Sequence, residues 1–364
     1  NTDAKESNDV TPTAPFGPTN VDMYGLRFDE QRLTYLSRPT SPPVQIGAQF
    51  TLAFWAKRTG DYITFGGGTG LSGEEQSNYA LIRIGENAID FYAVTNLSYA
   101  SVNVSNTPNE WTHYVISCLG DNGDIVVYVN GENVGGGGIF GDNKLLYVNF
   151  RIGASVWNPQ NNATDGYLSD VYLIQDQVLN ASVFGQSFDG KWGPKNSTVV
   201  KGTITSGGGF GANGFYLPFN PAAAGKNWSQ YVNETTESAH PASLGFDGNI
   251  YSIFYSETLA AGEYFTWTPS AGIPFTNGVR VRNADVAGAT IKFNNGTPVS
   301  FPANGWTTLA TGGGTLTSIA VTRNTIQVHG WTAIEVDDKI LLDHNNIGVD
   351  DSGNNNDFYD TEFG

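Results

Sequence analysis

One stretch of the chain, Trp111 to Ile174, alternates apolar and polar residues and is interrupted by short polar turns. It contains a run from Trp111 to Cys118 and another from Asp124 to Val129, which ends at Asn130-Gly131. A period of two places successive side chains on opposite faces of a strand, and Asn-Gly tolerates the positive φ angles of a tight hairpin. The order of strands and turns predicts an antiparallel β-sandwich.

The same alternation recurs along most of the chain. Further strands are expected at Phe50–Phe54, Tyr79–Ile84, Ile89–Val94, Leu168–Ile174, Ile250–Tyr255, Tyr264–Thr268, Val279–Arg282, Ile291–Phe293, Val299–Phe301, Thr315–Thr322, Thr325–Val328, Thr332–Val336 and Lys339–Leu342. Gly135–Gly138 is expected to be a loop. No window has a sustained period of 3.6, so very little helix is predicted beyond a turn at Asn180–Phe184 that Asn180 caps.

A chain of 364 residues usually holds two or more domains. The many short strands separated by glycine-rich and asparagine-rich turns predict an all-β protein with two antiparallel, jelly-roll-like β-sandwiches. The expected divisions are an extended arm at 1–20, a first sandwich at 21–190, a connector at 191–240, a second sandwich at 241–345 and an acidic tail at 346–364.

Charge excludes some classes of partner. The net charge is −17, and such a surface repels nucleic acid. Nine carboxylates and one lysine fall between Glu335 and Gly364, a run that predicts a solvated tail, with a divalent-cation site as the alternative. No stretch is long and apolar enough to cross a bilayer. The single cysteine, Cys118, lies within a predicted strand and is expected to be buried.

The strongest catalytic candidate is Glu335-Val336-Asp337, since alternate strand residues share a face and paired carboxylates cleave glycosidic bonds. Laminarinase-like sandwich glycosidases use such a fragment followed closely by a second glutamate, and that glutamate is absent here. Asp337-Asp338 also fits the turn of a hairpin between Ile334–Val336 and Ile340–Leu342. The sequence therefore predicts a protein that is not an enzyme, with a glycan depolymerase as the minor alternative.

Two loops have the composition of binding sites. Sugars are held by aromatic faces together with amide and carboxylate groups, and the loop around Pro159 offers such groups at Trp157, Asn158, Asn161, Asn162 and Asp165. A second loop offers oxygen ligands for Ca²⁺ at Asp121, Asn122 and Asp124. These residues are also ordinary turn formers, so plain turns remain the alternative for both loops.

Residues from about Phe28 to Phe188 resemble the laminin-G-like, concanavalin A-like lectin/glucanase superfamily. The matching pieces are FTLAFWAKRTG, EWTHYVIS, DIVVYVNGENVG, RIGA, and DGYLSDVYLI followed by LNASVFG. The resemblance implies a jelly-roll sandwich that often binds glycans, sometimes through Ca²⁺. Enzymes, lectins and structural modules share this fold, so it implies the fold more firmly than the function.

Three later segments are similar to virion structural proteins of tailed phages, notably marine ones. They are GANGFYLPF at Gly211–Phe219, GWTAIEVDDKILLD at Gly330–Asp343 and DDSGNNNDF at Asp350–Phe358. Asp337-Asp338 departs from the more usual Asp-Gly at that hairpin.

The phage-like resemblance implies a non-enzymatic tail fibre, spike or head decoration on the virion surface, assembled in the host cytoplasm. Its expected partners are other virion proteins, further copies of the same chain and host surface glycan. A secreted or cell-surface carbohydrate-binding adhesin is the alternative.

Overall fold

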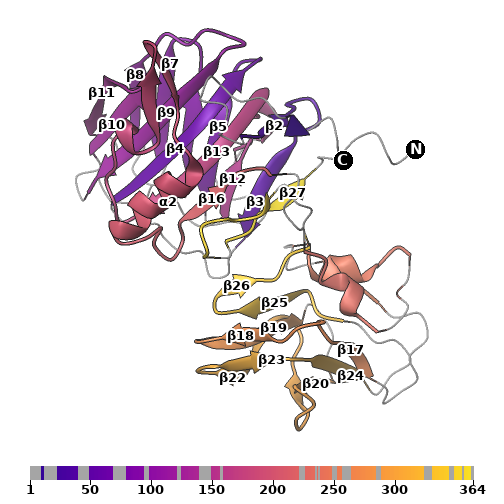
Figure 1. The fold of residues 1–364 in the computed structure, drawn as a ribbon. Helices are drawn as coiled ribbons and strands as arrows, with labels where there is room; N and C mark the ends of the chain where they lie inside the picture. The colour runs from indigo at the N-terminus through magenta and orange to yellow at the C-terminus, as the bar shows by residue number, and fades with distance from the viewer. Residues whose placement is uncertain are drawn as a thin grey trace. The chain divides into compact units, whose positions relative to one another are not determined.

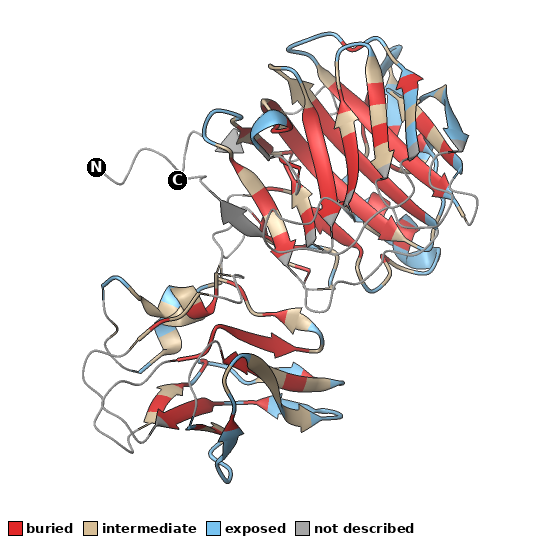
Figure 2. Cartoon of the chain, turned by 180° about the vertical axis from the view of Figure 1, so that it is seen from behind, coloured by how far each residue is buried: buried red, intermediate tan, exposed pale blue. Residues whose placement is uncertain are grey.

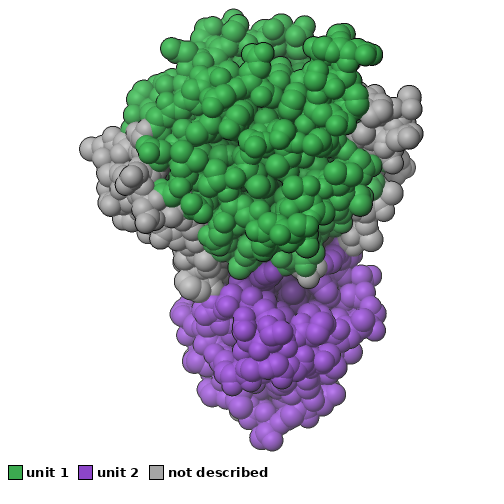
Figure 3. All heavy atoms as spheres, turned by 60° about the vertical axis from the view of Figure 1, so that its left-hand side comes forward, with its two compact units in different colours: residues 1–38, 42–225, 345–364 green, residues 39–41, 226–344 purple. Residues whose placement is uncertain are grey.

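The computed structural model describes residues 10–11, 23–39, 49–68, 79–93, 98–120, 124–138, 149–155, 159–220, 226–233, 236, 238–247, 252–255, 264–283, 288–323, 330–343, 348–354 and 356–361. The chain divides into two compact units, shown in different colours in Figure 3. Unit 1 comprises residues 1–38, 42–225 and 345–364, and unit 2 comprises residues 39–41 and 226–344. Unit 2 is therefore almost entirely an insertion between residues 225 and 345 of unit 1.

Two antiparallel sheets form the body of unit 1 (Figure 1). The larger has eight strands among the described residues: β1 (Val10–Thr11), β2 (Gly25–Phe28), β13 (Gly166–Gln175), β4 (Gln49–Arg58), β9 (Trp111–Leu119), β10 (Asp124–Val129) and β11 (Glu132–Gly138) in that order, with β16 (Phe215–Leu217) also paired to β13. The smaller has seven: β27 (Tyr359–Thr361), β3 (Tyr35–Pro39), β12 (Asn149–Ile152), β5 (Ile63–Gly68), β6 (Tyr79–Ile84), β7 (Ala88–Ala93) and β8 (Ser98–Asn103).

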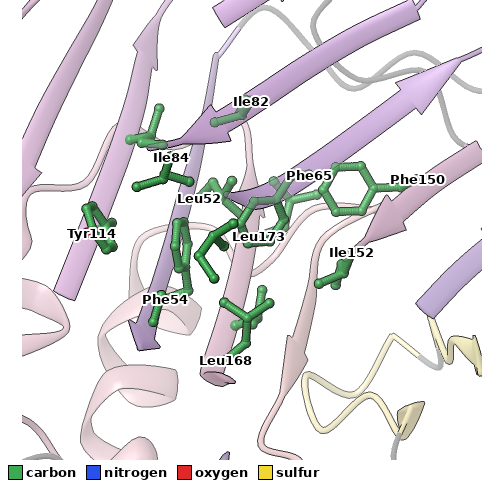
Figure 4. Packing of buried hydrophobic residues seen from close by; sticks show 14 of the residues in the cluster. Leu52, Phe54, Phe65, Ile82, Ile84, Tyr114, Phe150, Ile152, Leu168 and Leu173 are labelled. Carbon is green, nitrogen blue, oxygen red and sulfur yellow. The ribbon is translucent and has the colours of Figure 1, made fainter. Parts of the chain in front are cut away.

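The main core of unit 1 contains residues from both sheets. Figure 4 shows Leu52 and Phe54 of β4 near Phe65 of β5 and Ile82 of β6, and all four residues are fully buried. Strands β4, β9 and β13 are buried along most of their length, because the eight-stranded sheet is covered on both faces. In other strands, such as β7 and β10, core residues alternate with less buried ones, and Figure 2 shows both patterns. The all-β fold class predicted from this alternation is confirmed. Cys118 belongs to the same core as a free, buried thiol.

A further layer covers the outer face of the eight-stranded sheet. It contains the 3₁₀ turn η3 (Ala181–Val183), the hairpin of β14 (Gly185–Phe188) and β15 (Lys191–Pro194), and helix α2 (Ser197–Ser206), which Figure 1 draws across that sheet. Val200 and Ile204 of α2 pack in one buried cluster with Val115 and Tyr172 of the sheet. As predicted, the Asn180 side chain caps η3 by accepting from the Ser182 N–H.

Helix α2 was not predicted, because the sequence led us to expect very little helix beyond the turn at Asn180–Phe184 and a connector with loops at 191–240. Its sequence, STVVKGTITS, is rich in β-branched residues, which have low helix propensity. Tertiary packing outweighs that propensity because Val200 and Ile204 lie one turn apart on the buried face, and because the Asn196 side chain caps the first turn by accepting from the Thr198 N–H.

The C-terminal segment is also part of unit 1, which corrects the expectation of a solvated tail at 346–364. Phe358 is fully buried in the main core against Phe150 and Phe215, at ring-centroid distances of 6.4 and 4.7 Å. Asp350 is only 8% exposed, and its carboxylate accepts hydrogen bonds from the backbone N–H groups of Tyr216 (2.9 Å) and Asn356 (2.8 Å).

Two other expectations change in unit 1. The glycine-rich stretch 135–138, expected as a loop, belongs to β11 and pairs with β10. Within the arm expected at 1–20, Val10 and Thr11 form β1, which pairs with β2. The other residues of that arm lie outside the described part of the chain.

Unit 2 has its own aromatic core and three antiparallel sheets among its described residues. One sheet holds β17 (Tyr264–Trp267), β24 (Ile319–Arg323), β20 (Ala289–Phe293) and β21 (Val299–Phe301); a second holds β18 (Ile273–Phe275) and β23 (Gly314–Leu316); the third holds β22 (Gly305–Thr311), β19 (Gly278–Asn283), β25 (Ala333–Val336) and β26 (Lys339–Ile340). The described residues also contain the 3₁₀ turns η2 (Pro159–Asn161) in unit 1, and η4 (Ser229–Tyr231) and η5 (Ala242–Gly245) in unit 2.

Most strands predicted in unit 2 are present. The single strand expected at Thr315–Thr322 is split between β23 and β24, and residues 252–254 lie outside strands. The strand expected at Thr325–Val328 falls outside the described residues.

Candidate functional site

A cluster of polar and aromatic side chains lies on the outer face of the seven-stranded sheet. Arg83 lies between the core residues Ile82 and Ile84 of β6, so it projects from the opposite face. Arg83 pairs in register with Asp90 of β7, and Asp90 pairs with Ser101 of β8. We call the following residues the Arg83 cluster: Tyr62, Arg83, Asp90, Tyr92, Tyr99, Ser101 and Asn162.

Arg83 is the centre of this cluster. Its Nη2 donates to Asp90 Oδ2 at 2.9 Å and to Tyr92 Oη at 2.7 Å. Its Nη1 donates to Asn162 Oδ1 at 3.2 Å. The guanidinium carbon also lies 4.3 Å from the ring centroid of Tyr62 and 5.2 Å from that of Tyr92. Arg83 is thereby held in one orientation by contacts around its planar group.

The neighbouring strand β8 contributes an exposed aromatic ring. Tyr99 is 57% exposed, and its ring centroid lies 4.9 Å from that of Tyr92. The hydroxyls of Tyr99 and Ser101 each donate to Asp90 Oδ1, both at 3.0 Å. Asp90 therefore links three strands, and the ring of Tyr99 is fixed at its polar end while much of its surface remains accessible.

The protonation states in the cluster follow from these contacts. Burial opposes the charge on Arg83, but the hydrogen bond to Asp90 and the neighbouring tyrosines outweigh it and raise the pKa of Arg83. Burial likewise raises the pKa of Tyr92, although Arg83 opposes this shift. Arg83 is thus charged and Tyr92 protonated at neutral pH. A fixed ion pair beside an accessible ring suits reversible binding of a molecule with both hydroxyl groups and an apolar face.

The sequence-predicted ligand residues are separated by the structure. Asn162 is 8% exposed and belongs to the Arg83 cluster, whereas Asn161 is exposed at the end of η2. The Asp165 side chain forms an ion pair with Arg27 of β2 and not with a residue of this cluster, although its backbone N–H donates to the carbonyl oxygen of Tyr62 at 3.2 Å. Trp157 and Asn158 lie outside the described residues. A ligand role for these five residues stays a prediction.

Of the three residues predicted to bind Ca²⁺, only Asp124 lies in the described part of the chain. Asp124 is exposed at the start of β10, opposite Gly138 of β11, while Asp121 and Asn122 lie outside the described residues. Within the described ranges, no group of three or more His, Cys, Asp or Glu side chains is placed to hold a metal ion.

Glu335 and Asp337 of unit 2 do not form a carboxylate pair for glycoside cleavage. Glu335 is 2% exposed and accepts from Arg280 through both carboxylate oxygens, and burial raises its pKa although Arg280 opposes the shift. Asp337 and Asp338 have φ angles of 50° and 64°, so they form the tight turn between β25 and β26 that the sequence predicted.

The Asp337 carboxylate also serves the fold. It accepts from the backbone N–H groups of Thr276, Asn277 and Gly278, the shortest at 2.6 Å to Asn277. Burial alone would raise its pKa, but these hydrogen bonds lower it below the usual value. The depolymerase alternative therefore loses the two residues on which it was based.

Sequence analysis missed most of the Arg83 cluster. Its members occupy the polar positions of strands whose apolar positions identified the core. The available signal was register: once β6, β7 and β8 are paired as consecutive hairpins, Arg83, Asp90 and Ser101 fall in one row. Alternation alone reveals which residues face outward, but not which of them are neighbours.

Residues 33–183 match the family model of the concanavalin A-like lectin/glucanases superfamily. The match contains the whole Arg83 cluster and confirms the lectin/glucanase-like resemblance for this segment of unit 1. No curated protein matches the chain. No helix among the described residues has the length and apolarity that a membrane crossing requires.

Several solved structures resemble part of the chain. A heptameric SAP-like pentraxin from Limulus polyphemus has 16% identity and a TM-score of 0.32, covering 47% of this chain and 78% of its own. Domain 4 of an extracellular arabinanase from Geobacillus stearothermophilus, solved with arabinotriose, has 18% identity and a TM-score of 0.33, covering 46% and 78%. Tailspike protein 2 of the Escherichia coli O157:H7 bacteriophage CAB120 has 15% identity and a TM-score of 0.32, covering 45% and 24%.

Proposed function

We propose that unit 1 is a non-catalytic glycan-binding module and that the Arg83 cluster is its binding site. The observation that carries this proposal is the cluster itself: an exposed tyrosine ring beside a fixed Arg83–Asp90 pair, on the outer face of a sheet. Support comes from the lectin/glucanase family match, which spans every residue of the cluster.

In this proposal each part of the cluster has a separate task. A pyranose ring has one face of C–H groups, which packs against the accessible ring of Tyr99. Its hydroxyls both donate and accept hydrogen bonds, and they meet Arg83, Asp90 and the Tyr92 hydroxyl at the edge of that ring. Because the cluster is already ordered by its internal contacts, binding requires little further loss of side-chain freedom.

The proposal is tested with a glycan array followed by calorimetric titration of the strongest ligands. Tyr99→Ala is expected to weaken binding about tenfold, because it removes the stacking surface, a loss of order 1.4 kcal/mol. Val199→Ala is the matched control, because Val199 is equally exposed at 57% but lies on α2, at the covered face of the other sheet. Equal binding by wild type and Tyr99→Ala, or no binding by wild type, would contradict the proposal.

We also propose that the chain is a structural component of a phage virion surface, as a tail fibre, spike or head decoration. Support comes from the similarity of segments 211–219, 330–343 and 350–358 to virion proteins. Mass spectrometry of purified particles tests it, and absence of the chain from virions refutes it. The adhesin alternative predicts instead a signal peptide encoded upstream.

Two secondary expectations belong to this proposal. The chain assembles as a homo-oligomer, since sheets with open edges suit side-by-side association, and light scattering of the purified protein measures its mass.

Ca²⁺ at Asp121, Asn122 and Asp124 contributes to glycan binding, so a chelator is expected to weaken that binding. Unchanged binding after chelation removes the metal from the proposal.

A further inference from the structure

We infer that the Arg83 cluster selects neutral glycans and discriminates against acidic ones, with Asp90 as the residue that sets this selectivity. This inference rests on the proposed glycan-binding function and adds the class of ligand to it. It follows from the charge of the cluster, from its unused hydrogen-bonding groups and from the charge of the whole chain.

The charge of the cluster sums to zero. Arg83 and Asp90 form an ion pair at 2.9 Å, and their side chains are only 20% and 14% exposed. The other members of the cluster are tyrosine, serine and asparagine residues. A carboxylate or sulfate on a ligand would therefore approach Arg83 only in the presence of Asp90, and the attraction of one is offset by the repulsion of the other.

The donors of Arg83 are largely used within the cluster. Both hydrogens of Nη2 have partners in Asp90 and Tyr92, and Nε is buried without one. Nη1 has one partner, Asn162, which leaves one hydrogen for a ligand. Arg83 consequently lacks the two adjacent free N–H groups with which an arginine binds a carboxylate through two parallel hydrogen bonds.

The cluster has both hydrogen-bond donors and hydrogen-bond acceptors that its internal contacts do not use. The Tyr92 hydroxyl accepts from Arg83 and keeps its own hydrogen as a donor, because its pKa is raised. On the acceptor side, Asp90 receives three hydrogen bonds out of about four that a carboxylate accommodates, and the hydroxyl oxygens of Tyr99 and Ser101 have lone pairs left. Mixed donors and acceptors match neutral hydroxyl groups, whereas an anionic group would leave the acceptors facing negative charge.

The charge of the whole chain acts in the same direction. At a net charge of −17, the surface repels polyanionic glycans before they reach any site. Salt reduces this long-range term, while the local balance between Arg83 and Asp90 persists because the pair is half-buried.

The test uses the complete chain and an array in which each neutral oligosaccharide is paired with the same backbone carrying a carboxylate or a sulfate. Wild type is expected to bind the neutral member about tenfold more tightly. Asp90→Asn keeps the shape of the side chain but leaves Arg83 unpaired, so the preference is expected to vanish or reverse. Asp189→Asn is the control: it changes the net charge equally, at an exposed turn between β14 and β15.

Wild type also provides a test that needs no variant. Affinity for the neutral ligands is expected to change less than twofold between 50 and 500 mM NaCl, since no net charge is paired on binding. Tighter binding of the acidic members by wild type, weakened about tenfold in Tyr99→Ala, would overturn the neutral selectivity and leave the glycan-binding function intact. Binding of neither member would remove both.

Discussion

Asp170 shows how one buried carboxylate couples the stability of unit 1 to pH. It lies at an irregularity in β13 with a φ angle of 47°, is 7% exposed, and accepts from the hydroxyls of Tyr216 and Ser169. Burial raises its pKa to about 6, although both hydroxyls oppose the shift. The folded protein thus holds a proton on Asp170 at pH values where the unfolded chain has released it, since an unfolded aspartate titrates near 3.9.

Asp170→Asn is expected to change the pH dependence of unfolding. In wild type, the contribution of Asp170 to stability is fully present below about pH 4 and falls by roughly 3 kcal/mol as the pH rises through 6. Asparagine has no such titration and tolerates the left-handed backbone. The variant should therefore gain stability relative to wild type between pH 4.5 and pH 7, as measured by urea unfolding at both values.

The comparison with Asp170→Asn is needed because His113 acts with the opposite sign. His113 is 1% exposed, accepts from Trp192 Nε1 at 3.0 Å, and burial lowers its pKa to about 3. Its contribution is lost as the pH falls below about 6.5, so the wild-type curve is a sum of both groups. The role assigned to Asp170 would be contradicted if the difference in unfolding free energy between variant and wild type were the same at both pH values.

At the scale of single elements, β11 depends on one glycine and not on its neighbour. A Cβ on Gly136 would lie 1.9 Å from the carbonyl oxygen of Ile125 in β10, whereas a Cβ on Gly137 meets nothing within 4 Å. Both residues are paired with β10 in the same hairpin. The glycine-rich composition therefore reflects a close approach of two backbones at one position.

Gly136→Ala is expected to destabilise unit 1 by about 1–3 kcal/mol, because β10 and β11 must separate to make room. Gly137→Ala is expected to lie within about 0.5 kcal/mol of wild type, as is usual at sites without close contacts. Chemical denaturation of the two variants measures the difference. Equal stabilities for the two would mean that β11 is not held at this distance.

The segment from Gly348 to Phe358 is a second element whose composition misleads. Besides the contacts of Asp350, the side-chain amide of Asn354 donates to the carbonyl oxygens of Gly211 and Gly214 at 2.7 and 2.9 Å. Two of the segments that resemble virion proteins, 211–219 and 350–358, are therefore bonded to each other. Asp350 and Asp357 of this segment accept from backbone N–H groups, whereas Asp351 forms an ion pair with Lys201 at 2.8 Å. Its one phenylalanine completes the main core.

Phe358→Ala is expected to destabilise unit 1 by about 3–5 kcal/mol, the usual cost of removing a fully buried phenylalanine. Phe358→Leu retains most of the apolar volume and should cost less than half as much. Guanidinium unfolding followed by circular dichroism measures both. A cost below about 0.5 kcal/mol for the alanine variant would show that the segment behaves as a solvated tail after all.

These elements show what the sequence could predict and what it could not. Strand β10, whose apolar residues alternate, and the hairpin at Asp337-Asp338 were predictable, because period and turn chemistry are local properties. Helix α2 and the buried position of Phe358 were not, since distant residues decide them. The Arg83 cluster lies between these cases: its residues were readable as outward-facing, but their meeting depends on the register of three strands.

At the scale of the whole molecule, each unit has a separate core. The main cluster of unit 1 contains Phe54, Phe65 and Phe358, and that of unit 2 contains Trp267 and Trp331, with no residue in common. Cores that share no residues are expected to melt independently.

Differential scanning calorimetry of the full chain should therefore resolve two transitions. Phe358→Ala is expected to lower the temperature of one, and Val281→Ala, a fully buried site in unit 2, that of the other. A single transition that both variants lower equally would show that the units unfold as one cooperative block.

The insertion of unit 2 has a consequence for biosynthesis. A ribosome delivers residues 226–344 before it delivers Phe358 and β27, which unit 1 needs to fill its core and to pair with β3. The unit that begins first is thus the last to be finished, and the nascent chain must keep an incomplete sandwich from sticking to its neighbours while the later unit folds.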